Sequence, residues 1–276
     1  MSTLCDLHTH TTASDGQYTP AELAGLAKER GLSVLAVTDH DTIAGTAEAQ
    51  RAGSKLGLTV IRGVELSAKD YPNCHILGYG LRDGDTELAR LCEKLRAGRD
   101  ERKYKIVDFL REKGVDIDLT EVEELAGGGV IARPHFAQAM VRHGYVSTNR
   151  EAFDRYLNTE EFRRRVKRFK VDAKTCVEAI KAAGGKASLA HPYQMGLPDD
   201  ELAGLLGRLK GWGLDAIECY YPKYSPEQQA LYLHLAEQYQ LHATGGSDFH
   251  GEKVKPDIQL AALALELGWL FDKSVS

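Results

Sequence analysis

Two histidines lie two positions apart near the start of the chain, in the segment Asp6-Leu7-His8-Thr9-His10. The segment begins like a strand, and alternate residues of a strand project from the same face, so His8 and His10 can bind one cation together. A carboxylate, Asp15, follows five positions later. The alternative is that the two histidines share an exposed strand face, because short motifs often occur by chance. The rest of the chain must therefore support the metal site.

Further His, Asp and Glu side chains occur at or beside the ends of later apolar runs. The ends of strands are where α/β folds place their active sites. Buried ionisable groups are costly unless they are paired or bind a metal, so ordinary packing explains this repetition poorly. The full set of candidate metal ligands is His8, His10, Asp15, His40, Glu65, His75, His191, Asp248 and His250.

The elements that position these residues follow from the hydrophobic pattern. Between residues 1 and 82, short apolar runs alternate with helical segments, which is typical of parallel βα units. We expect a helix from Pro20 to about Arg30 with Thr19 as its N-cap, a buried strand over 34–37, and a second helix capped by Thr42. Two more strands are expected in this part, over 58–64 and 75–79. The same alternation returns after about residue 172, where we expect strands over 186–190, 216–219 and just before Gly245, and helices over 173–183, 198–210 and 226–239.

The middle of the chain, residues 84–170, is rich in Arg, Lys and Glu with helical periodicity and little strand signal. It predicts a helical insertion into a barrel formed by residues 1–83 and 171–276. Within it, Gly127-Gly128-Gly129 predicts a turn, and Arg133-Pro134-His135 follows at the start of a helix. A solvated helix end is the alternative reading of that segment. The basic run 163–168 can bind phosphate, but such runs are more often exposed faces.

Composition narrows the class of protein. The chain has 276 residues, of which 43% are hydrophobic and 27% charged, and a net charge of -5. These values suit a globular α/β protein and argue against binding duplex DNA or a membrane through a basic surface. The five cysteines form no CxxC pair, the N-terminus lacks a signal-peptide pattern, and no apolar run reaches 18 residues. We therefore expect a cytoplasmic protein with reduced thiols.

Five motifs in order resemble those of the PHP (polymerase and histidinol phosphatase) family, across essentially the whole chain. They are His8-Thr9-His10, Thr38-Asp39-His40-Asp41, Gly63-Val64-Glu65, Ala190-His191-Pro192 and Ser247-Asp248-Phe249-His250. The resemblance implies a distorted (β/α)7 barrel that holds two or three divalent cations, manganese, zinc or iron, and hydrolyses phosphoesters. A metal-bridging hydroxide would attack phosphorus, because clustered cations lower the pKa of bound water and neutralise phosphoryl oxygens.

The resemblance also implies which residues bind each cation. His8, His10, Glu65 and Asp248 hold the first; Glu65 bridges to a second held by His75 and His191; Asp15, His40 and His250 hold the third. Some family members have histidine where this chain has Asp15, so the resemblance determines the occupancy of the third site least.

The segment Arg133-Pro134-His135 is similar to a branch of the family with three activities: 3',5'-nucleotide bisphosphate phosphatases, 5'-3' exoribonucleases on short RNA, and a phosphoribosyl cyclic-phosphate phosphodiesterase. By this resemblance Arg133 and His135 contact phosphate and act in catalysis with Glu65 and Asp248. Many relatives continue after Leu157 with Gly-x-Pro-Ala-Tyr-Val, whereas this chain reads Asn158-Thr159-Glu160-Glu161-Phe162-Arg163, so its substrate-binding rim can differ.

We therefore expect a phosphoesterase acting on a small phosphorylated substrate, with release of the 3'-phosphate from a 3',5'-nucleotide bisphosphate as the favoured reaction. Hydrolysis of a phosphoribosyl cyclic phosphate and 5'-3' cleavage of short RNA are the alternatives. A non-catalytic metal-binding module fits poorly, since no expected ligand is missing. Tyr220, Tyr221 and Tyr224 follow a strand end and either stack on a base or sugar or are packing residues.

Overall fold

A computed structural model describes residues 2–126 and 131–272. They form two compact units: residues 1–93 with 170–276, called here the barrel unit, and residues 94–169, called the helical unit. The predicted turn at Gly127-Gly128-Gly129 lies outside the described residues. The domain limits expected from the sequence, 83/84 and 170/171, stay a prediction.

The barrel unit is built on one sheet of eight strands in the order β7-β6-β5-β4-β3-β2-β1-β8. The strands are β1 (Thr3–Asp6), β2 (Val34–Val37), β3 (Thr59–Ser67), β4 (His75–Tyr79), β5 (Lys186–Leu189), β6 (Ala216–Tyr220), β7 (His242–Gly245) and β8 (Leu263–Leu265).

The sheet curves until the segments that follow β1 and β7 meet. The Leu7 N–H donates to the Gly245 carbonyl oxygen at 3.2 Å, and the Asp248 N–H donates to the His8 carbonyl oxygen at 2.8 Å. Gly246 permits this approach, because a Cβ at its position would lie 2.4 Å from the His8 Cβ. The predicted distorted (β/α) barrel is thus confirmed.

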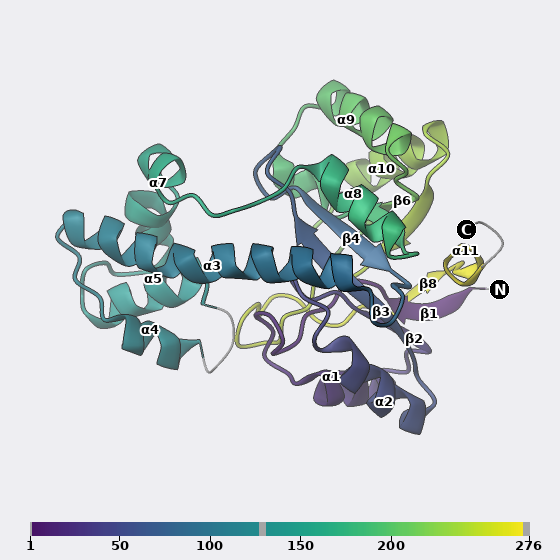
Figure 1. Cartoon of the computed structure of the whole chain (residues 1–276), viewed down its shortest axis with the longest axis horizontal. Coiled ribbons are helices and arrows are strands. Elements are labelled where there is room, and N and C mark those ends of the chain that lie inside the picture. The colour runs from purple at the N-terminus through teal and green to yellow at the C-terminus, as the bar shows by residue number, and fades with distance from the viewer. Residues whose placement is uncertain (1, 127–130, 273–276) are drawn as a thin grey trace. The chain divides into compact units, whose positions relative to one another are not determined.

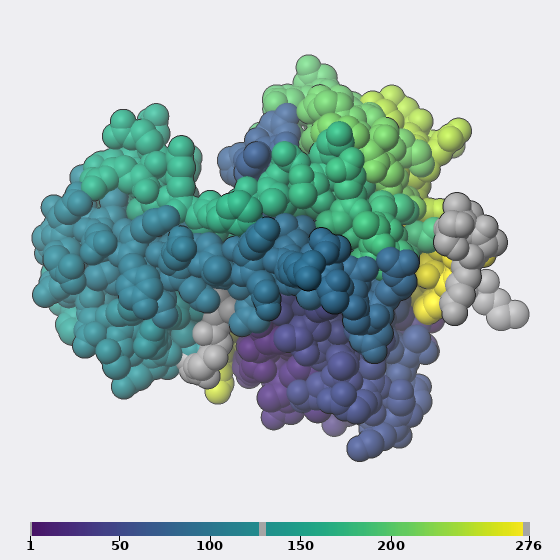
Figure 2. Space-filling view, in the orientation of Figure 1, coloured from purple at the N-terminus to yellow at the C-terminus, as the bar shows by residue number. Residues whose placement is uncertain are grey.

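Helices cover the outside of this sheet, with α1 and α2 on one side and α8, α9 and α10 on the other (Figure 1). In Figure 2 the blue-violet atoms of the segment with α1 and α2 lie along the lower edge, and the green atoms of the segment with α8, α9 and α10 lie along the upper edge. Their bounds are α1 (Pro20–Glu29), α2 (Thr46–Leu56), α8 (Ala173–Ala182), α9 (Asp199–Gly211), α10 (Pro226–Gln238) and α11 (Gly268–Phe271).

The first two helices test the expected caps. α1 begins as predicted: the Thr19 side chain accepts from the Glu22 N–H, and the Glu22 carboxylate accepts from the Thr19 N–H. The prediction that Thr42 caps the next helix is wrong, because α2 begins at Thr46. The Thr42 hydroxyl accepts instead from the Ala44 N–H at 3.2 Å, in a local turn of the kind threonine favours.

Strand β4 departs from the parallel pattern expected for residues 1–82. It is antiparallel to β3 and to β5, because the connection 68–74 contains no helix that could carry the chain back across the sheet. The expected parallel pairing is therefore wrong for this strand. One consequence favours the site: His75 begins β4 opposite Ser67, the last residue of β3.

The core explains the uninterrupted apolar run of β2, whose four residues are all buried. Leu35 and Val37 belong to a cluster with Leu23 of α1. Val34 and Ala36 belong to a second cluster on the other face of the sheet. Since both faces of the strand are covered, alternation of polar and apolar residues is absent.

The helical unit has its own apolar core, formed by residues such as Phe109, Phe136, Met140 and Phe162. The predicted helical insertion is thus confirmed. None of the helices in the described residues is long and apolar enough to cross a membrane. The elements are α3 (Thr86–Glu112), which begins in the barrel unit, α4 (Leu119–Leu125), α5 (Arg133–Arg142), α6 (Asn149–Ala152), the π-helical turn η1 (Phe153–Leu157) and α7 (Glu160–Arg165).

Candidate metal centre

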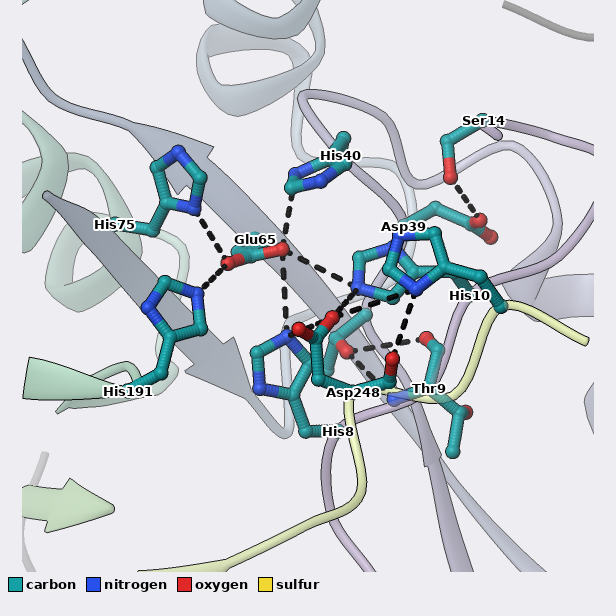
Figure 3. A network of polar contacts seen from close by, with 12 residues as sticks. His8, Thr9, His10, Ser14, Asp39, His40, Glu65, His75, His191 and Asp248 are labelled. Carbon is teal, nitrogen blue, oxygen red and sulfur yellow. Dashed lines mark hydrogen bonds and ion pairs between the residues drawn. The ribbon is translucent and has the colours of Figure 1, made fainter. Parts of the chain in front are cut away.

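The nine candidate ligands gather at one end of the barrel, and Figure 3 labels all of them except Asp15 and His250. The short loops after β1, β2, β5 and β7 carry most of them, β3 carries Glu65 within its length, and β4 begins with His75. Because β4 is antiparallel to β3 and β5, its first residue lies at the end of the sheet where β3 and β5 finish. His75 therefore lies at the same end of the barrel as the other candidate ligands. One edge of the sheet therefore collects residues that are up to 242 positions apart, from His8 to His250.

Glu65 lies at the centre of this group, and its two oxygens face different histidines (Figure 3). Oε1 is 2.7 Å from His75 Nδ1 and 2.9 Å from His191 Nε2. Oε2 is 3.3 Å from the Nε2 atoms of both His8 and His10, and it is 2.9 Å from His40 Nδ1. This arrangement suits a carboxylate that bridges two cations.

Asp248 divides its two oxygens in a similar way. Oδ1 is 3.3 Å from His10 Nε2 and 3.7 Å from His8 Nε2. Oδ2 accepts hydrogen bonds from Lys255 Nζ at 2.6 Å and from the Tyr221 hydroxyl at 3.1 Å. Only Oδ1 therefore faces the candidate ligands, while Lys255 and Tyr221 fix the rotation of the carboxylate.

Asp15 is the centre of a neighbouring group. Its Oδ1 is 3.4 Å from His250 Nε2 and 3.9 Å from His10 Nδ1, and its Oδ2 is 4.0 Å from His40 Nε2. The loop that carries Asp15 is held by Asp39, which accepts from the Thr11 N–H at 2.7 Å and from the Ser14 hydroxyl at 2.6 Å.

Three sets of side chains are close enough together for each set to hold one cation. They are His8, His10, Glu65 and Asp248; His10, Asp15, His40 and His250; and His40, Glu65 and His75. The first set has the same members as the first site implied by the resemblance. The second set contains the expected third site and adds His10. His191 belongs to none of the three sets, although it contacts Glu65.

Unpartnered atoms show that divalent cations fit this cluster. Buried polar atoms in native proteins nearly always have hydrogen-bond partners, and exceptions point to a missing ion or water. In the described part of the chain, seven buried atoms of the candidate ligands have none. They are His8 Nε2, His10 Nδ1 and Nε2, Asp15 Oδ1, His40 Nδ1, Glu65 Oε2 and His191 Nδ1.

A buried carboxylate outside the predicted set, Glu218 of β6, orients two of the histidines. Its Oε1 lies 3.0 Å from His8 Nδ1, and its Oε2 accepts from the His191 N–H at 2.7 Å. A carboxylate on the far nitrogen of a histidine fixes its tautomer and strengthens it as a metal ligand. The sequence carried a signal for Glu218, because it is the only charged residue in the apolar strand Ala216–Tyr220.

Electrostatics place Glu65, His75 and His250 in the protonation states that metal binding requires. Burial would raise the pKa of Glu65, but nearby histidines, His40 first among them, hold it well below its usual range. Burial lowers the pKa of His75 to about 3 against the opposing pull of Glu65. Burial and the charge of His10 lower the pKa of His250 to about 4. An ionised carboxylate and neutral imidazoles result, and both bind cations directly.

His8 and His10 differ from these ligands. At both residues the neighbouring carboxylates outweigh burial and raise the pKa of the imidazole. A cation that binds there therefore displaces a proton.

Backbone strain coincides with the site. Asp41, His191 and Asp248 have positive φ angles of 53°, 24° and 57°, a region that residues other than glycine rarely adopt. Asp41 accepts hydrogen bonds from the N–H and hydroxyl of Ser67 at the end of β3. Such strain persists where surrounding contacts enforce it, and it concentrates at functional sites.

Arg133 and His135 lie at the start of α5 in the helical unit. Arg133 Nη1 donates to the Leu157 carbonyl oxygen at 3.3 Å. His135 Nδ1 accepts from the Ala132 N–H at 3.1 Å, so the proton of the neutral ring is on Nε2. The candidate metal ligands belong to the other unit, and the predicted contact of Arg133 and His135 with the scissile phosphate stays a prediction.

Other singled-out residues have structural explanations. Arg165, in the basic run 163–168, pairs with Glu112 at 2.6 Å and with Glu161 at 3.2 Å, as expected of an exposed helix face. Tyr221 is buried and its ring contacts that of Tyr224, which favours packing for these tyrosines. All five cysteines are buried and free of disulfides.

A nearly closed α/β barrel that gathers histidines and carboxylates around unpartnered buried nitrogens is typical of metal-dependent hydrolases. Residues 6–179 match the family model described as "PHP domain". The chain therefore belongs to the PHP domain family, as its motifs predicted.

Three relatives share most of their length with this chain. A "5'-3' exoribonuclease" of Haemophilus influenzae is 36% identical over 89% of each chain. A "phosphoribosyl 1,2-cyclic phosphate 1,2-diphosphodiesterase" of Eggerthella lenta is 35% identical over 90% of this chain and 94% of its own. A "3',5'-nucleoside bisphosphate phosphatase" of Chromobacterium violaceum is 31% identical over 89% of this chain and 86% of its own.

Among solved structures, a protein from Bifidobacterium adolescentis assigned as a metal-dependent phosphoesterase is 31% identical. It superimposes with a TM-score of 0.79 over 94% of this chain and 92% of its own. The fold, the family and these relatives agree on the reaction class. The protein is a metal-dependent phosphoesterase.

Proposed function

We propose that the nine candidate ligands bind two or three divalent cations, manganese, zinc or iron, and that the protein hydrolyses a 3',5'-nucleotide bisphosphate with release of the 3'-phosphate. The observation that carries the metal assignment is the position of Glu65. Its Oε1 contacts His75 and His191, while its Oε2 faces His8, His10 and His40. One carboxylate can therefore belong to two adjoining cation sites.

In this proposal the first cation binds to His8, His10, Glu65 and Asp248, which form one compact set. The second shares Glu65 and takes His75 with His191. The third takes Asp15, His40 and His250, and His10 lies between the first and third sites because its two nitrogens face different carboxylates. His40 likewise faces both Glu65 and Asp15.

Bound cations would supply a nucleophile at neutral pH, by lowering the pKa of water, and would neutralise phosphoryl oxygens. The protein supplies the other parts. Glu218 holds the His8 ring so that Nε2 faces the Glu65 carboxylate, and Lys255 holds Asp248 with one oxygen directed inward. Arg133 would add charge-assisted hydrogen bonds to phosphate. His135 would donate from Nε2 to a phosphate or to the leaving alkoxide.

Two observations favour a nucleotide with two phosphates. The Chromobacterium violaceum relative carries the name of a nucleoside bisphosphate phosphatase and matches across nearly the whole chain. Arg133 forms no ion pair with a carboxylate of the described residues, so its charge is available for an anionic substrate. A protein with a net charge of -5 needs such a local cation to attract one.

Stepwise 5'-3' hydrolysis of short RNA is the second candidate. The relative from Haemophilus influenzae, 36% identical, carries that activity in its name. Both substrates have a 5'-phosphate followed by an ester at the 3' position, so one site can serve either. Hydrolysis of a phosphoribosyl cyclic phosphate, named for the Eggerthella lenta relative, is the third.

A hydrolysis screen with chromatographic separation of the products tests the proposal, because RNA releases a mononucleotide and an opened cyclic phosphate releases a phosphomonoester, whereas the bisphosphate releases inorganic phosphate. Metal-loaded protein is given adenosine 3',5'-bisphosphate, a cyclic ribose phosphate, simple monophosphates and a 5'-phosphorylated trinucleotide RNA, with Asp248→Asn as the inactive control. We expect the highest kcat/KM for the bisphosphate. A tenfold preference for the RNA or for the cyclic phosphate would replace the proposed substrate by that alternative, and turnover equal in the Asp248→Asn protein would remove the metal site from the reaction.

A further inference from the structure

A lysine of the barrel unit forms an ion pair with one of the candidate metal ligands. Lys255 lies in the loop after β7, and its Nζ is 2.6 Å from Asp248 Oδ2. The other oxygen of that carboxylate, Oδ1, lies 3.3 Å from His10 Nε2 and 3.4 Å from His250 Nδ1. The carboxylate therefore has an ammonium group on one oxygen and candidate metal ligands around the other.

The position of Lys255 calls for an explanation beyond neutralising Asp248. A metal cation bound to Asp248 would already neutralise the carboxylate, and like charges repel at short range. An ammonium group beside a cation site is therefore unfavourable until an anion binds near both. The Asp248 side chain is only 4% exposed, whereas that of Lys255 is 34% exposed. An incoming anion can thus reach the ammonium group from solvent.

The hydrogen bonds of Lys255 leave donor capacity for such an anion. Within the part of the chain that the structure describes, Nζ donates only to Asp248, to Oδ2 at 2.6 Å and to the backbone carbonyl oxygen at 3.5 Å. An ammonium group has three N–H donors. At least one of them is therefore available on the exposed side of the group.

The loop that carries Lys255 is fixed to the segment around Gln17, two residues after the candidate ligand Asp15. The Lys255 N–H donates to the Gly251 carbonyl oxygen at 2.8 Å. Gly251 has a φ angle of 94°, and a Cβ at its position would lie 2.3 Å from the Gln17 Cβ, so the approach requires glycine. The Gln17 side chain accepts from the Lys253 N–H at 2.8 Å. Lys255 is therefore held in place before a ligand binds, which limits the entropy lost on binding.

We propose that Lys255 binds the phosphoryl group that is hydrolysed. Its Nζ donates to an oxygen of that group, beside the cation site to which Asp248 Oδ1 belongs. A preorganised cationic donor stabilises the negative charge that develops on phosphoryl oxygens in the transition state. The inference rests on the proposed function in one respect, that cations bind to the candidate ligands. It does not depend on which phosphoester is the substrate, because the contact is with the group common to all of them.

Binding of inorganic phosphate tests the contact. Lys255→Gln removes the charge and keeps an N–H donor for Asp248, and Lys253→Gln, at an exposed position of the same loop, is the matched control. In calorimetric titrations of the manganese-loaded proteins, we expect the Kd for phosphate to rise by about tenfold or more in Lys255→Gln, as for the loss of one charge-assisted hydrogen bond. It should not change in Lys253→Gln. An unchanged Kd in Lys255→Gln would overturn the contact.

The same proteins distinguish the contact from a purely positioning role, in which Lys255 only orients Asp248. Positioning alone predicts a weaker affinity for manganese and a normal Kd for phosphate once manganese is saturating, and that result would overturn the contact. The proposed contact predicts weaker phosphate binding even at saturating manganese. Manganese content is measured by mass spectrometry in each titrated sample.

A structural measurement on the unaltered protein covers the case in which Lys255→Gln does not fold. Crystals loaded with manganese are soaked in tungstate, a heavy analogue of phosphate, and the anomalous signals of both metals are mapped. We expect manganese at the candidate ligands and a tungstate oxygen within hydrogen-bond distance of Lys255 Nζ. If manganese is present and tungstate does not contact Lys255, only the lysine contact fails. If tungstate contacts Lys255 and the candidate ligands hold no manganese, only the proposed metal centre fails.

Discussion

The barrel unit and the helical unit handle buried charge in opposite ways. In the barrel unit, imidazoles and carboxylates are interleaved, and Glu65 alone contacts five histidines. In the helical unit, the half-buried guanidinium groups of Arg102 and Arg133 have no carboxylate partner among the described residues. The ligand atoms of the barrel unit are therefore arranged to bind a cation. The guanidinium groups of the helical unit are arranged to bind an anion.

This difference indicates complementary ligands. Carboxylates and neutral imidazoles bind divalent cations, whereas clustered guanidinium groups bind phosphate. A phosphoester suits both kinds of site, because metal-bound cations and guanidinium groups each attract its negative charge. The two units can therefore be tested separately, through metals for one and through phosphates for the other.

Metal removal should have the largest effect and should act on the barrel unit. We expect dialysis against a chelator to abolish hydrolysis, and manganese, zinc or iron to restore it. Loss of bound ions should also speed amide hydrogen exchange near Glu65 more than in α5, since ligands that bind only the native state stabilise it by about 2.7 kcal/mol at 100 times Kd. The comparison would be contradicted if the protein kept full activity although metal analysis detected no residual ion.

Asp248→Asn should come next, with loss of hydrolysis on the order of 10³-fold, which corresponds to several kcal/mol of lost metal-assisted catalysis. The variant keeps the shape of the side chain, so circular dichroism should match the wild type. Asp257→Asn, at an exposed position, is the control and should behave as wild type. Wild-type turnover by Asp248→Asn would reject metal-assisted catalysis at this cluster.

Arg133→Ala tests the helical unit. We expect kcat/KM to fall by on the order of 2 to 3 kcal/mol, comparable to the loss of one preorganised donor to the transition state. Metal content, measured by mass spectrometry, should not change, because Arg133 is not one of the candidate metal ligands. An unchanged kcat/KM would remove Arg133 from catalysis, and a change in metal content would break the separation between the units.

Glu218→Gln should have the smallest effect of the four changes. Unlike Arg133→Ala, it should weaken metal binding. Its carboxylate holds the Nδ1 side of His8, and loss of such a partner typically weakens metal affinity or activity by about 10- to 100-fold. A metal titration followed by activity should show a higher metal requirement with a kcat that recovers at saturation. A loss confined to KM for substrate would instead assign Glu218 to substrate binding.

Much of the fold could be predicted because local signals agreed with it. Thr19-Pro20 predicted the start of α1, and the apolar run 34–37 predicted β2. The failures lie where no local signal exists. The direction of β4 depends on the connection 68–74, and β8 is only three residues long, Leu263–Leu265. The start of α2 failed because the Thr42 hydroxyl serves a turn.

The residues around the candidate ligands were harder to predict than the ligands themselves. Histidine and aspartate at strand ends form recognisable motifs, whereas Glu218 and Lys255 act through single contacts with residues that lie far away or across a loop. Arg102 shows the same limit: in the sequence it is one of many basic residues in a charged helix, and only its burial distinguishes it.

The sequence by itself determined which chemical groups are available and in what order the strands deliver them, because residue type, spacing and hydrophobic period are local properties of the chain. The tertiary structure decided which of these groups meet. Closure of the barrel brings Asp248 beside His8 through a backbone contact made possible by Gly246. Antiparallel β4 places His75 against Glu65. These contacts join residues distant in sequence, so only the packing of the strands sets them.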